Sequence, residues 1–332
     1  MKQCFSMMTI GLFMICASTA QAGNKPSDVP VGMGPLPTVV PVPADNPMSE
    51  AKIELGKQLY FDPALSLSGN ISCNSCHNLG NGGVDNQRFS IGHKWQRGGR
   101  NAPTVLNAAF WRTQFWDGRA PLLEDQAKGP PLNPVEMADI SESQLMDRLK
   151  DAGYDPLFTK VFGEESLNYN NMAKAIAAFE RTLLTPDAPF DRYVRGEADL
   201  SKAAKRGMRK VDDAGCTSCH SGPLFTNNSF QRFDYGTDDG RKAVTDDAAD
   251  DHFFRVQSWR NVALTAPYFH DGSVATLDEA IRIMAEKQLD TELSDKDVSD
   301  IVAFLNTLTG TQPVVTYPIL PRPTGRALDF RD

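Results

Sequence analysis

Two pentapeptides, CNSCH at 73–77 and CTSCH at 216–220, share the pattern Cys-x-x-Cys-His. Cysteines three residues apart on a helical turn lie on one face, so both sulfurs can bond the vinyl groups of one porphyrin. The histidine that follows, His77 or His220, then lies beneath the iron as its proximal ligand. We therefore predict two covalently bound haem c groups. The predicted attachment residues are Cys73, Cys76, Cys216 and Cys219.

Two other kinds of site use cysteine and histidine in short patterns. A zinc site would have to combine ligands from both motifs, which lie far apart in the sequence. A redox-active disulfide of the thioredoxin type needs no adjoining histidine, whereas here a histidine follows twice. Of the six cysteines, Cys4 and Cys16 lie near the N-terminus and the other four belong to the two motifs. No thiol is left for an ordinary disulfide, and haem attachment accounts for this usage best.

A candidate sulfur ligand follows the second motif. Met284 lies thirteen residues after Asp271, in a segment with helical spacing. A thioether there would complete a His/Met haem of raised reduction potential, suited to accepting and passing electrons. Alternatively, Met284 fills an apolar helix face together with Leu277 and Ile281. Its cytochrome-like spacing from a haem motif favours the ligand interpretation.

The first motif lacks the matching methionine. Thirteen residues after Asp117 stands Pro130, which cannot bind iron. His93 lies nearby in a glycine-flanked loop that could move toward or away from an iron, and Gln126 and Glu136 lie around a proline-rich segment. A haem with a displaceable ligand and a nearby carboxylate is a place for substrate chemistry. An isolated His or Glu is more often a surface or capping residue, so this prediction depends on the difference between the two copies.

The N-terminus has the pattern of a secretory signal. Lys2 precedes an apolar run, and AQA at 20–22 offers a cleavage site. The run is interrupted by polar residues and is shorter than the ~20 residues that a membrane-spanning helix needs. We predict that residues 1–22 are a signal peptide, that the mature protein has no membrane span, and that it is periplasmic.

Charge and length limit the remaining possibilities. The 332-residue chain has a formal net charge of −8, which becomes more negative when Lys2 leaves with the signal peptide, so nucleic acid is not an expected partner. An acidic surface favours either a basic partner or simply solubility, and the same applies to the Asp-rich loop from Asp238 to Asp251. About 310 mature residues exceed what one hydrophobic core usually serves, so two domains are expected.

Hydrophobic periodicity predicts a mostly α protein. Six segments have helical spacing, and no run of alternating strands is present. These segments are residues 51–60, 143–152, 171–184, 201–211, 276–289 and 294–308. The last begins with Ser294 and Asp297, which resemble a capping box. The predicted divisions are a proline-rich arm at 23–47, an N-terminal haem domain at 48–188, a C-terminal haem domain at 189–311 and an extended tail at 312–332.

An internal duplication extends beyond the two motifs. The matched elements are Arg100-Asn101 with Arg260-Asn261, Asp117-Gly118 with Asp271-Gly272, and the stretch from Leu123 with the stretch from Leu277. Two related modules in tandem are the natural interpretation. We expect the boundary between Pro186 and Tyr193, and the tail could lie back across the first module.

Together these features resemble the bacterial di-haem cytochrome c peroxidases, a family that includes MauG-like enzymes. The resemblance runs from about Pro47 to Gly310. Besides the haem motifs, it rests on RNAPT at 100–104, FWDGR at 115–119 and LTAPYFHDG at 264–272. It implies two tandem cytochrome c-like haem domains with long loops and little β structure, and it suggests a homodimer.

The resemblance implies ligands for both irons. His77 would be the proximal ligand of a low-potential, peroxidatic haem, with His93 as its removable distal ligand. His220 and Met284 would hold the high-potential haem. An electron that reaches the second haem would promote release of His93 and open the first iron to peroxide.

Further residues match the family's working groups. Glu136 would be the acid/base carboxylate of the peroxide pocket, with Gln126 as its companion. Trp116 would conduct electrons between the haems.

A calcium site is also implied at the domain interface. Asn101 would provide a side-chain oxygen, and Thr265 and Pro267 their backbone carbonyls, which suits an ion that prefers oxygen ligands.

The predicted function is reduction of hydrogen peroxide to water with electrons from a small cytochrome c or a blue copper protein. One alternative is MauG-like oxidation of a protein substrate. Against it, the MauG-like proteins carry tyrosine where this chain has Met284. The other alternative is a non-enzymatic di-haem electron carrier, in which both irons keep six ligands.

Overall fold

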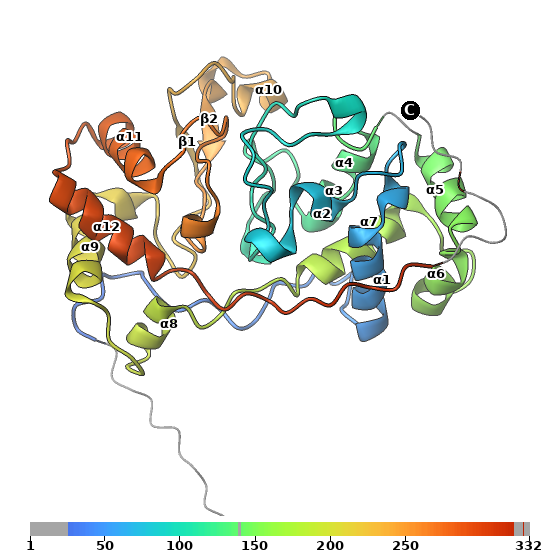
Figure 1. Cartoon of the computed structure of the whole chain (residues 1–332), viewed down its shortest axis with the longest axis horizontal. Coiled ribbons are helices and arrows are strands. Elements are labelled where there is room, and N and C mark those ends of the chain that lie inside the picture. The colour runs from blue at the N-terminus through green and yellow to red at the C-terminus, as the bar shows by residue number, and fades with distance from the viewer. Residues whose placement is uncertain (1–25, 139–140, 322–327, 329–332) are drawn as a thin grey trace, which may run out of the picture.

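The computed structural model describes residues 26–138, 141–321 and 328, so the predicted signal peptide at 1–22 lies outside the described residues. Figure 1 shows an elongated molecule with helices gathered at each end and long loops between them. The prediction of a mostly α protein with little β structure is confirmed. Within the described residues, no helix is long and apolar enough to cross a membrane.

The helices of the first end come from the N-terminal part of the chain. They are α1 (Glu50–Phe61), α2 (Cys73–Cys76), α3 (Leu123–Gln126), α4 (Gly129–Leu132), α5 (Glu142–Asp151), α6 (Asp155–Phe162) and α7 (Tyr169–Glu180). The remaining helices are α8 (Pro189–Val194), α9 (Lys202–Asp213), α10 (Lys242–Thr245), α11 (Leu277–Leu289) and α12 (Asp295–Asn306). Strands β1 (Phe230–Arg232) and β2 (Phe253–Arg255) pair antiparallel between the two ends.

All six predicted helices are present, although α7 ends four residues early and α12 two residues early. The structure adds α6 and α8, which are short and carry proline in the first turn. Proline fits that position because its missing N–H would be unpaired there anyway. Ser294 caps α12 by accepting from the Asp297 amide at 3.2 Å, and its hydroxyl donates to the Asp297 carboxylate, so half of the predicted capping box forms.

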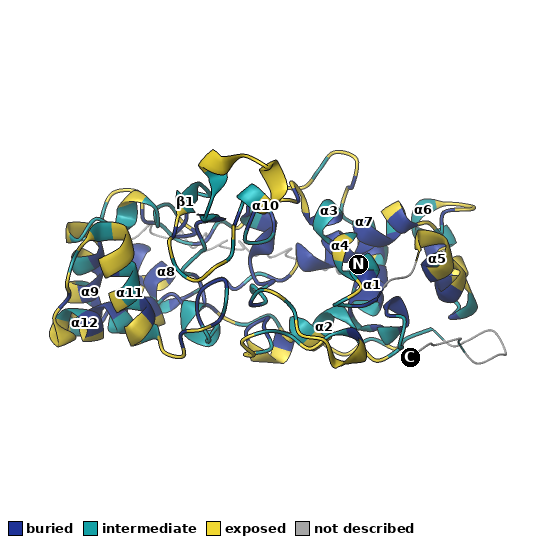
Figure 2. Cartoon of the chain, turned by 90° about the horizontal axis from the view of Figure 1, so that it is seen from above, coloured by how far each residue is buried: buried dark blue, intermediate teal, exposed yellow. Residues whose placement is uncertain are grey.

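Each end is a helical bundle whose central crossing depends on a glycine. In the first bundle (α1, α5, α6 and α7), a Cβ atom on Gly56 would lie 1.9 Å from the backbone oxygen of Ala175. In the second bundle (α9, α11 and α12), a Cβ atom on Gly207 would lie 1.9 Å from the backbone oxygen of Asp300. Figure 2 shows that exposed residues gather on the outer turns of the second bundle, whereas α7 is buried in the first.

The internal duplication is present, but one predicted pairing is wrong. Asn261 begins its 3₁₀ turn in a left-handed conformation with φ 62° and ψ 13°. The residue with the same conformation and position in the first copy is Asn107, with φ 61° and ψ 11°, rather than the predicted Asn101. The isolated β-bridge between Gln114 and Ala120 recurs in the second copy between Tyr268 and Val274, at the same sequence offset as Asn107 and Asn261. The two Arg-Asn dipeptides match by letter only, because Asn101 caps no turn.

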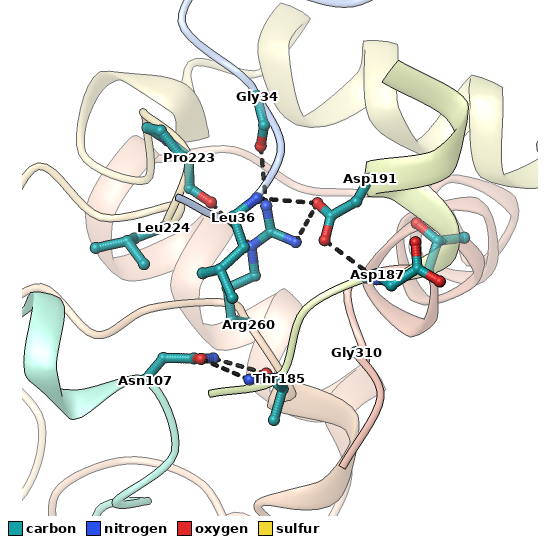
Figure 3. Close-up of polar contacts among 12 residues, drawn as sticks. Gly34, Leu36, Asn107, Thr185, Asp187, Asp191, Pro223, Leu224, Arg260 and Gly310 are labelled. Carbon is teal, nitrogen blue, oxygen red and sulfur yellow. Dashed lines mark hydrogen bonds and ion pairs between the residues drawn. The ribbon is translucent and has the colours of Figure 1, made fainter. Parts of the chain in front are cut away.

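These two asparagines meet at the chain segment that joins the bundles. The side-chain amides of Asn107 and Asn261 both donate to the Thr185 hydroxyl, each at 2.8 Å, and the Thr185 amide donates to Asn107 at 2.9 Å. All three residues are buried. Nearby, Arg260 and Asp191 form a fully buried ion pair at 2.6 Å (Figure 3).

The proline-rich arm and the tail both connect the two bundles. The arm packs Val29 and Met33 into the core of the second bundle and then reaches the first, where the Asn46 amide donates to Glu124 at 2.6 Å. The tail also runs from the second bundle to the first (Figure 1), where the Tyr317 ring contacts Phe61 at 5.1 Å between centroids. The described part of the arm is therefore anchored to both bundles by buried residues, which its composition did not predict.

Replacing Gly207 with alanine should destabilise the second bundle. Helix propensity alone would favour alanine, but α9 and α12 must separate to admit the Cβ atom, at a cost of roughly 1–3 kcal/mol. Thermal unfolding of the haem-loaded protein followed by circular dichroism measures the effect. G34A is the control, because a Cβ atom on Gly34 meets nothing within 4 Å. Equal melting temperatures for G207A and G34A would contradict this account of the crossing.

Candidate haem sites

The first motif lines a cavity of about 480 Å³, called cavity 1. Cys73 and Cys76 lie on the single turn of α2, as the motif predicted, and His77 follows at its C-terminal end. Gln126 from α3 and Glu136 from the loop after α4 line the same cavity. The structure thus brings together the predicted attachment residues of the first motif and two of the predicted catalytic residues, Gln126 and Glu136.

The second motif lines a separate cavity of about 460 Å³, called cavity 2. Cys216 begins a 3₁₀ turn and Cys219 follows its end, and His220 and Met284 line the same cavity. Because the two motifs face different cavities, their residues do not combine into a zinc site. All four cysteines of the motifs are free thiols and stand available for thioether bonds.

Both motif histidines are oriented by a backbone carbonyl. Nδ1 of His77 donates to the Pro103 oxygen at 3.0 Å, and Nδ1 of His220 donates to the Phe225 oxygen at 3.2 Å. A proton fixed on Nδ1 leaves Nε2 as the nitrogen for iron. Burial lowers the pKa of His77 and lowers that of His220 to about 4, so both rings are neutral, as a metal ligand must be. Two thiols and one such histidine in each cavity fit haem c.

The two cavities differ at the position of the sixth ligand. Met284 lines cavity 2 from α11, beside Leu277 and Ile281. Pro130, the residue predicted to stand at its equivalent position, lines cavity 1. Cavity 1 also contains Met137, which the sequence did not single out and which belongs to the buried core of the first bundle.

One stretch of chain forms part of the wall of both cavities. Residues 101–104 line both, together with Trp111 and Trp116. The Trp116 indole N–H donates to the backbone oxygen of Asn101 at 2.9 Å, and the centroid of its ring lies 6.3 Å from that of the His270 ring. Trp116 therefore lies between the cavities, where a conduit for electrons would have to be.

Glu136 is held by a neighbour of its own loop. The Asn133 amide donates to one carboxyl oxygen of Glu136 at 2.9 Å. Burial raises the pKa of Glu136, against the opposing effects of the charge on Arg119 and the hydrogen bond from Asn133. A carboxyl that lines a cavity and has a raised pKa is a candidate acid/base group.

His93 is buried but does not line cavity 1. Its backbone amide donates to the backbone oxygen of Glu136 at 2.8 Å, and its Nδ1 atom is enclosed without a hydrogen-bond partner among the described residues. A Cβ atom on Gly92 would lie 2.0 Å from the Val135 oxygen, so glycine is required where this loop meets the Glu136 loop.

The three residues of the predicted calcium site line cavity 2 together. They are Asn101, Thr265 and Pro267. The Asn101 amide nitrogen donates to the Gln87 oxygen at 2.9 Å, which leaves the side-chain oxygen of Asn101 for other partners. No cluster of three or more His, Cys, Asp or Glu side chains that could hold a metal occurs in the described part of the chain.

The structure adds a charged network that sequence reasoning missed. Arg100, beside cavity 1, binds Asp117 at 2.5 Å and Asp238 at 2.6 Å. Asp238 begins the Asp-rich loop, so this loop is anchored at one end, while residues 243–249 are exposed. No short-range pattern links Arg100 to Asp238, because the contact depends on the tertiary fold.

Comparisons with known proteins agree with this geometry. A family model described as di-haem cytochrome c peroxidase matches residues 50–199. The chain is 43% identical to the cytochrome c551 peroxidase of Pseudomonas aeruginosa, over 97% of each chain. It is 39% identical to the methylamine utilization protein MauG of Methylorubrum extorquens, over 86% of each chain. A solved MauG-like protein associated with microbial copper homeostasis has a TM-score of 0.76 at 31% identity, covering 86% of this chain and 95% of that one.

Met284 in cavity 2 and Met137 in cavity 1 provide a matched test of iron ligation. Met284→Leu should remove the sulfur ligand of the second haem, lower its reduction potential and change its optical spectrum in the reduced state. Met137→Leu keeps a similar volume in the core and should leave both haem spectra unchanged. If M137L rather than M284L altered a haem spectrum, the ligand assignment would be wrong.

Proposed function

This chain belongs to the di-haem cytochrome c peroxidase family, and we propose that it reduces hydrogen peroxide to water with electrons from a small redox protein. The observation that carries the proposal is the unequal pair of cavities. Met284 lines cavity 2, whereas cavity 1 has Pro130 at the corresponding position and adds Glu136 and Gln126. One site is suited to electron transfer and the other to substrate chemistry.

We place one haem c in each cavity, within two tandem domains at 48–188 and 189–311. When bound, the two haems supply the redox chemistry of the reaction. Cys73 and Cys76 would form the thioether bonds in cavity 1, and Cys216 and Cys219 those in cavity 2. His77 and His220, each oriented through Nδ1, would present Nε2 to iron.

Electrons would arrive at cavity 2 and reach cavity 1 across the shared wall. Trp116 is part of that wall, and its hydrogen bond to the Asn101 oxygen fixes the ring in place. A rigid ring requires little rearrangement when an electron passes. This support makes Trp116 the proposed conduit.

Glu136 would move the proton that cleavage of the O–O bond requires. Reduction of one hydrogen peroxide consumes two electrons and two protons and yields two waters. In our proposal Glu136 takes the proton from the peroxide oxygen nearer to the first haem and gives it to the other peroxide oxygen, which leaves as water. The Gln126 amide, in the same cavity, would hydrogen-bond the peroxide. Asn133 holds one carboxyl oxygen of Glu136 and so directs the other.

His93 would be the removable ligand of the first iron. It lies on a loop in which Lys94 and Trp95 both have positive φ, 55° and 62°. Each left-handed residue other than glycine costs about 1–2 kcal/mol, so the observed loop conformation is strained. The hydrogen bond from the His93 amide to the backbone oxygen of Glu136 would couple any movement of this loop to the backbone that carries the catalytic carboxylate.

MauG-like oxidation of a protein substrate is the second candidate, supported by the 39% identity to a MauG protein. Met284 weighs against it, because tyrosine is expected at that position in MauG-like enzymes. Peroxide reduction with ordinary electron donors would decide in favour of the peroxidase.

The proposal has further parts. The donor would be a small cytochrome c or a blue copper protein, and the enzyme a periplasmic homodimer. Calcium would bind Asn101 and the carbonyls of Thr265 and Pro267, where it would join residues from both ends of the molecule.

Replacing Glu136 with glutamine should lower kcat for peroxide reduction by roughly 10²–10⁴-fold, the usual contribution of a positioned acid/base group. Both haem spectra should be retained. Asn133→Ala, which frees the carboxyl and removes the acceptor of the Val135 amide, should cause a smaller loss. Steady-state turnover with a reduced cytochrome c measures both, and near-normal turnover by E136Q would remove Glu136 from the mechanism.

The double replacement Cys216→Ala and Cys219→Ala should reduce the covalently bound haem from two groups to one. Intact-protein mass spectrometry under denaturing conditions measures this directly. Ser218→Ala, between the two cysteines, should retain both groups. A wild-type chain whose mass includes no haem would exclude covalent attachment.

A further inference from the structure

Glu180 is a buried carboxyl that neither the fold nor the proposed reaction uses. It is the last residue of α7, is 5% exposed, and lines cavity 1 one helical turn after Ile176. Its neighbour Arg181 does not neutralise it, because the Arg181 guanidinium binds both carboxyl oxygens of Glu124 at 2.7 and 2.8 Å. A cavity-facing glutamate without a cation therefore lies beside the first haem motif.

The Glu180 carboxyl faces the open space of cavity 1. Its side chain makes no hydrogen bond within the described part of the chain. Its oxygens are nevertheless not fully enclosed by protein atoms, in contrast to Nδ1 of His93. Burial raises its pKa to about 8. In Glu124 burial has the same tendency, but hydrogen bonds from Arg181 and Asn46 outweigh it and lower the pKa. Glu124 is thus a structural carboxylate, and Glu180 is free to exchange a proton.

The charged groups around Glu180 are few. Arg181 and Glu124 act on it with opposite sign. Tyr60, on α1, and Cys73, on α2, also feel the charge of Glu180, but the Tyr60 hydroxyl donates to the His77 oxygen and Cys73 is a proposed haem attachment residue. Glu136, the other carboxyl of cavity 1, also interacts with Cys73. No positive charge other than Arg181 acts strongly on Glu180, so its proton affinity should follow the charge inside the cavity.

We propose that Glu180 binds one proton from solvent when an electron enters cavity 1 and releases that proton when the electron leaves. The inference rests on the proposed haem at Cys73, Cys76 and His77. The oxidised haem carries one more positive charge than the reduced haem, and this charge stabilises the ionised carboxylate. Reduction removes the charge, so the neutral acid becomes favoured. Each electron is accompanied by one proton, and Glu180 thereby holds in the cavity one of the two protons that peroxide reduction consumes.

The test measures the reduction potential of each haem from about pH 6 to pH 9 in the wild type, E180Q and the surface control E164Q. Glu180 should have a lower pKa when the first haem is oxidised and a higher pKa when it is reduced. Between these two values, the reduction potential of the first haem in the wild type should fall by up to about 59 mV per pH unit, the value for one proton per electron. E180Q should match the wild type at low pH, where both side chains are neutral. At high pH the reduction potential of the first haem should be higher in E180Q than in the wild type by at least about 59 mV, which corresponds to a tenfold change in the equilibrium constant for reduction. The second haem should not change in E180Q, and E164Q should follow the wild type.

Parallel curves for wild type and E180Q over the whole range would overturn the inference. E136Q removes the other carboxyl of cavity 1 but keeps Glu180. At high pH, the reduction potential of its first haem should therefore still lie below that of E180Q, as in the wild type. If E180Q does not fold, infrared difference spectra of the wild type give the answer: reduction should produce the C=O band of a new protonated carboxyl, and its absence would contradict the proposal. None of these measurements uses peroxide, so they can succeed or fail independently of the proposed peroxidase activity.

Discussion

The proline side chain has no atom that can bind iron, and this limits what the first haem can do. Pro130 lines cavity 1, whereas a thioether lines cavity 2 at Met284. At this position only cavity 2 has a side chain that can offer sulfur to iron, and cavity 1 adds the carboxyl of Glu136 and the amide of Gln126. The proposed division of the molecule into an electron-transfer site and a substrate site follows from this one difference.

The two sites can cooperate only if the wall between them is fixed. Residues 101–104 and Trp116 form part of both cavities, so a shift in one affects the other. Three connections hold the two bundles around this wall. The Thr185 hydroxyl accepts from an asparagine of each copy, the arm joins the core of the second bundle to α1 and α3, and the tail lies against α1. The two bundles are thus tied together by the segment around Thr185, by the arm and by the tail.

The sequence was most informative where local patterns determine structure. The six long helices follow from hydrophobic periodicity, and both haem motifs adopt the turns that their spacing requires. The difference between Met284 and Pro130 could be read by counting residues from the Asp-Gly pairs. Short helices such as α6 were missed, because eight residues give too little periodicity.

Residues whose role depends on tertiary contacts could not be found in this way. The register of the duplication was misjudged at Asn101, since two identical letters carry no information about left-handed turns. The sequence gives no sign that Arg181 is occupied by Glu124 and therefore leaves Glu180 without a cation. His93 was identified as a candidate, but its place beside the cavity rather than in its lining depends on the close approach of Gly92 to Val135.

The central claim is that one iron keeps both axial ligands and the other has a coordination position for peroxide. Optical and electron paramagnetic resonance spectra of the half-reduced protein, recorded before and after mixing with peroxide, test it most directly. The account predicts that the second haem stays six-coordinate and low-spin, while the first loses its sixth protein ligand and reacts with peroxide. Two six-coordinate haems in every redox state, neither of which reacts with peroxide, would contradict it and leave an electron carrier.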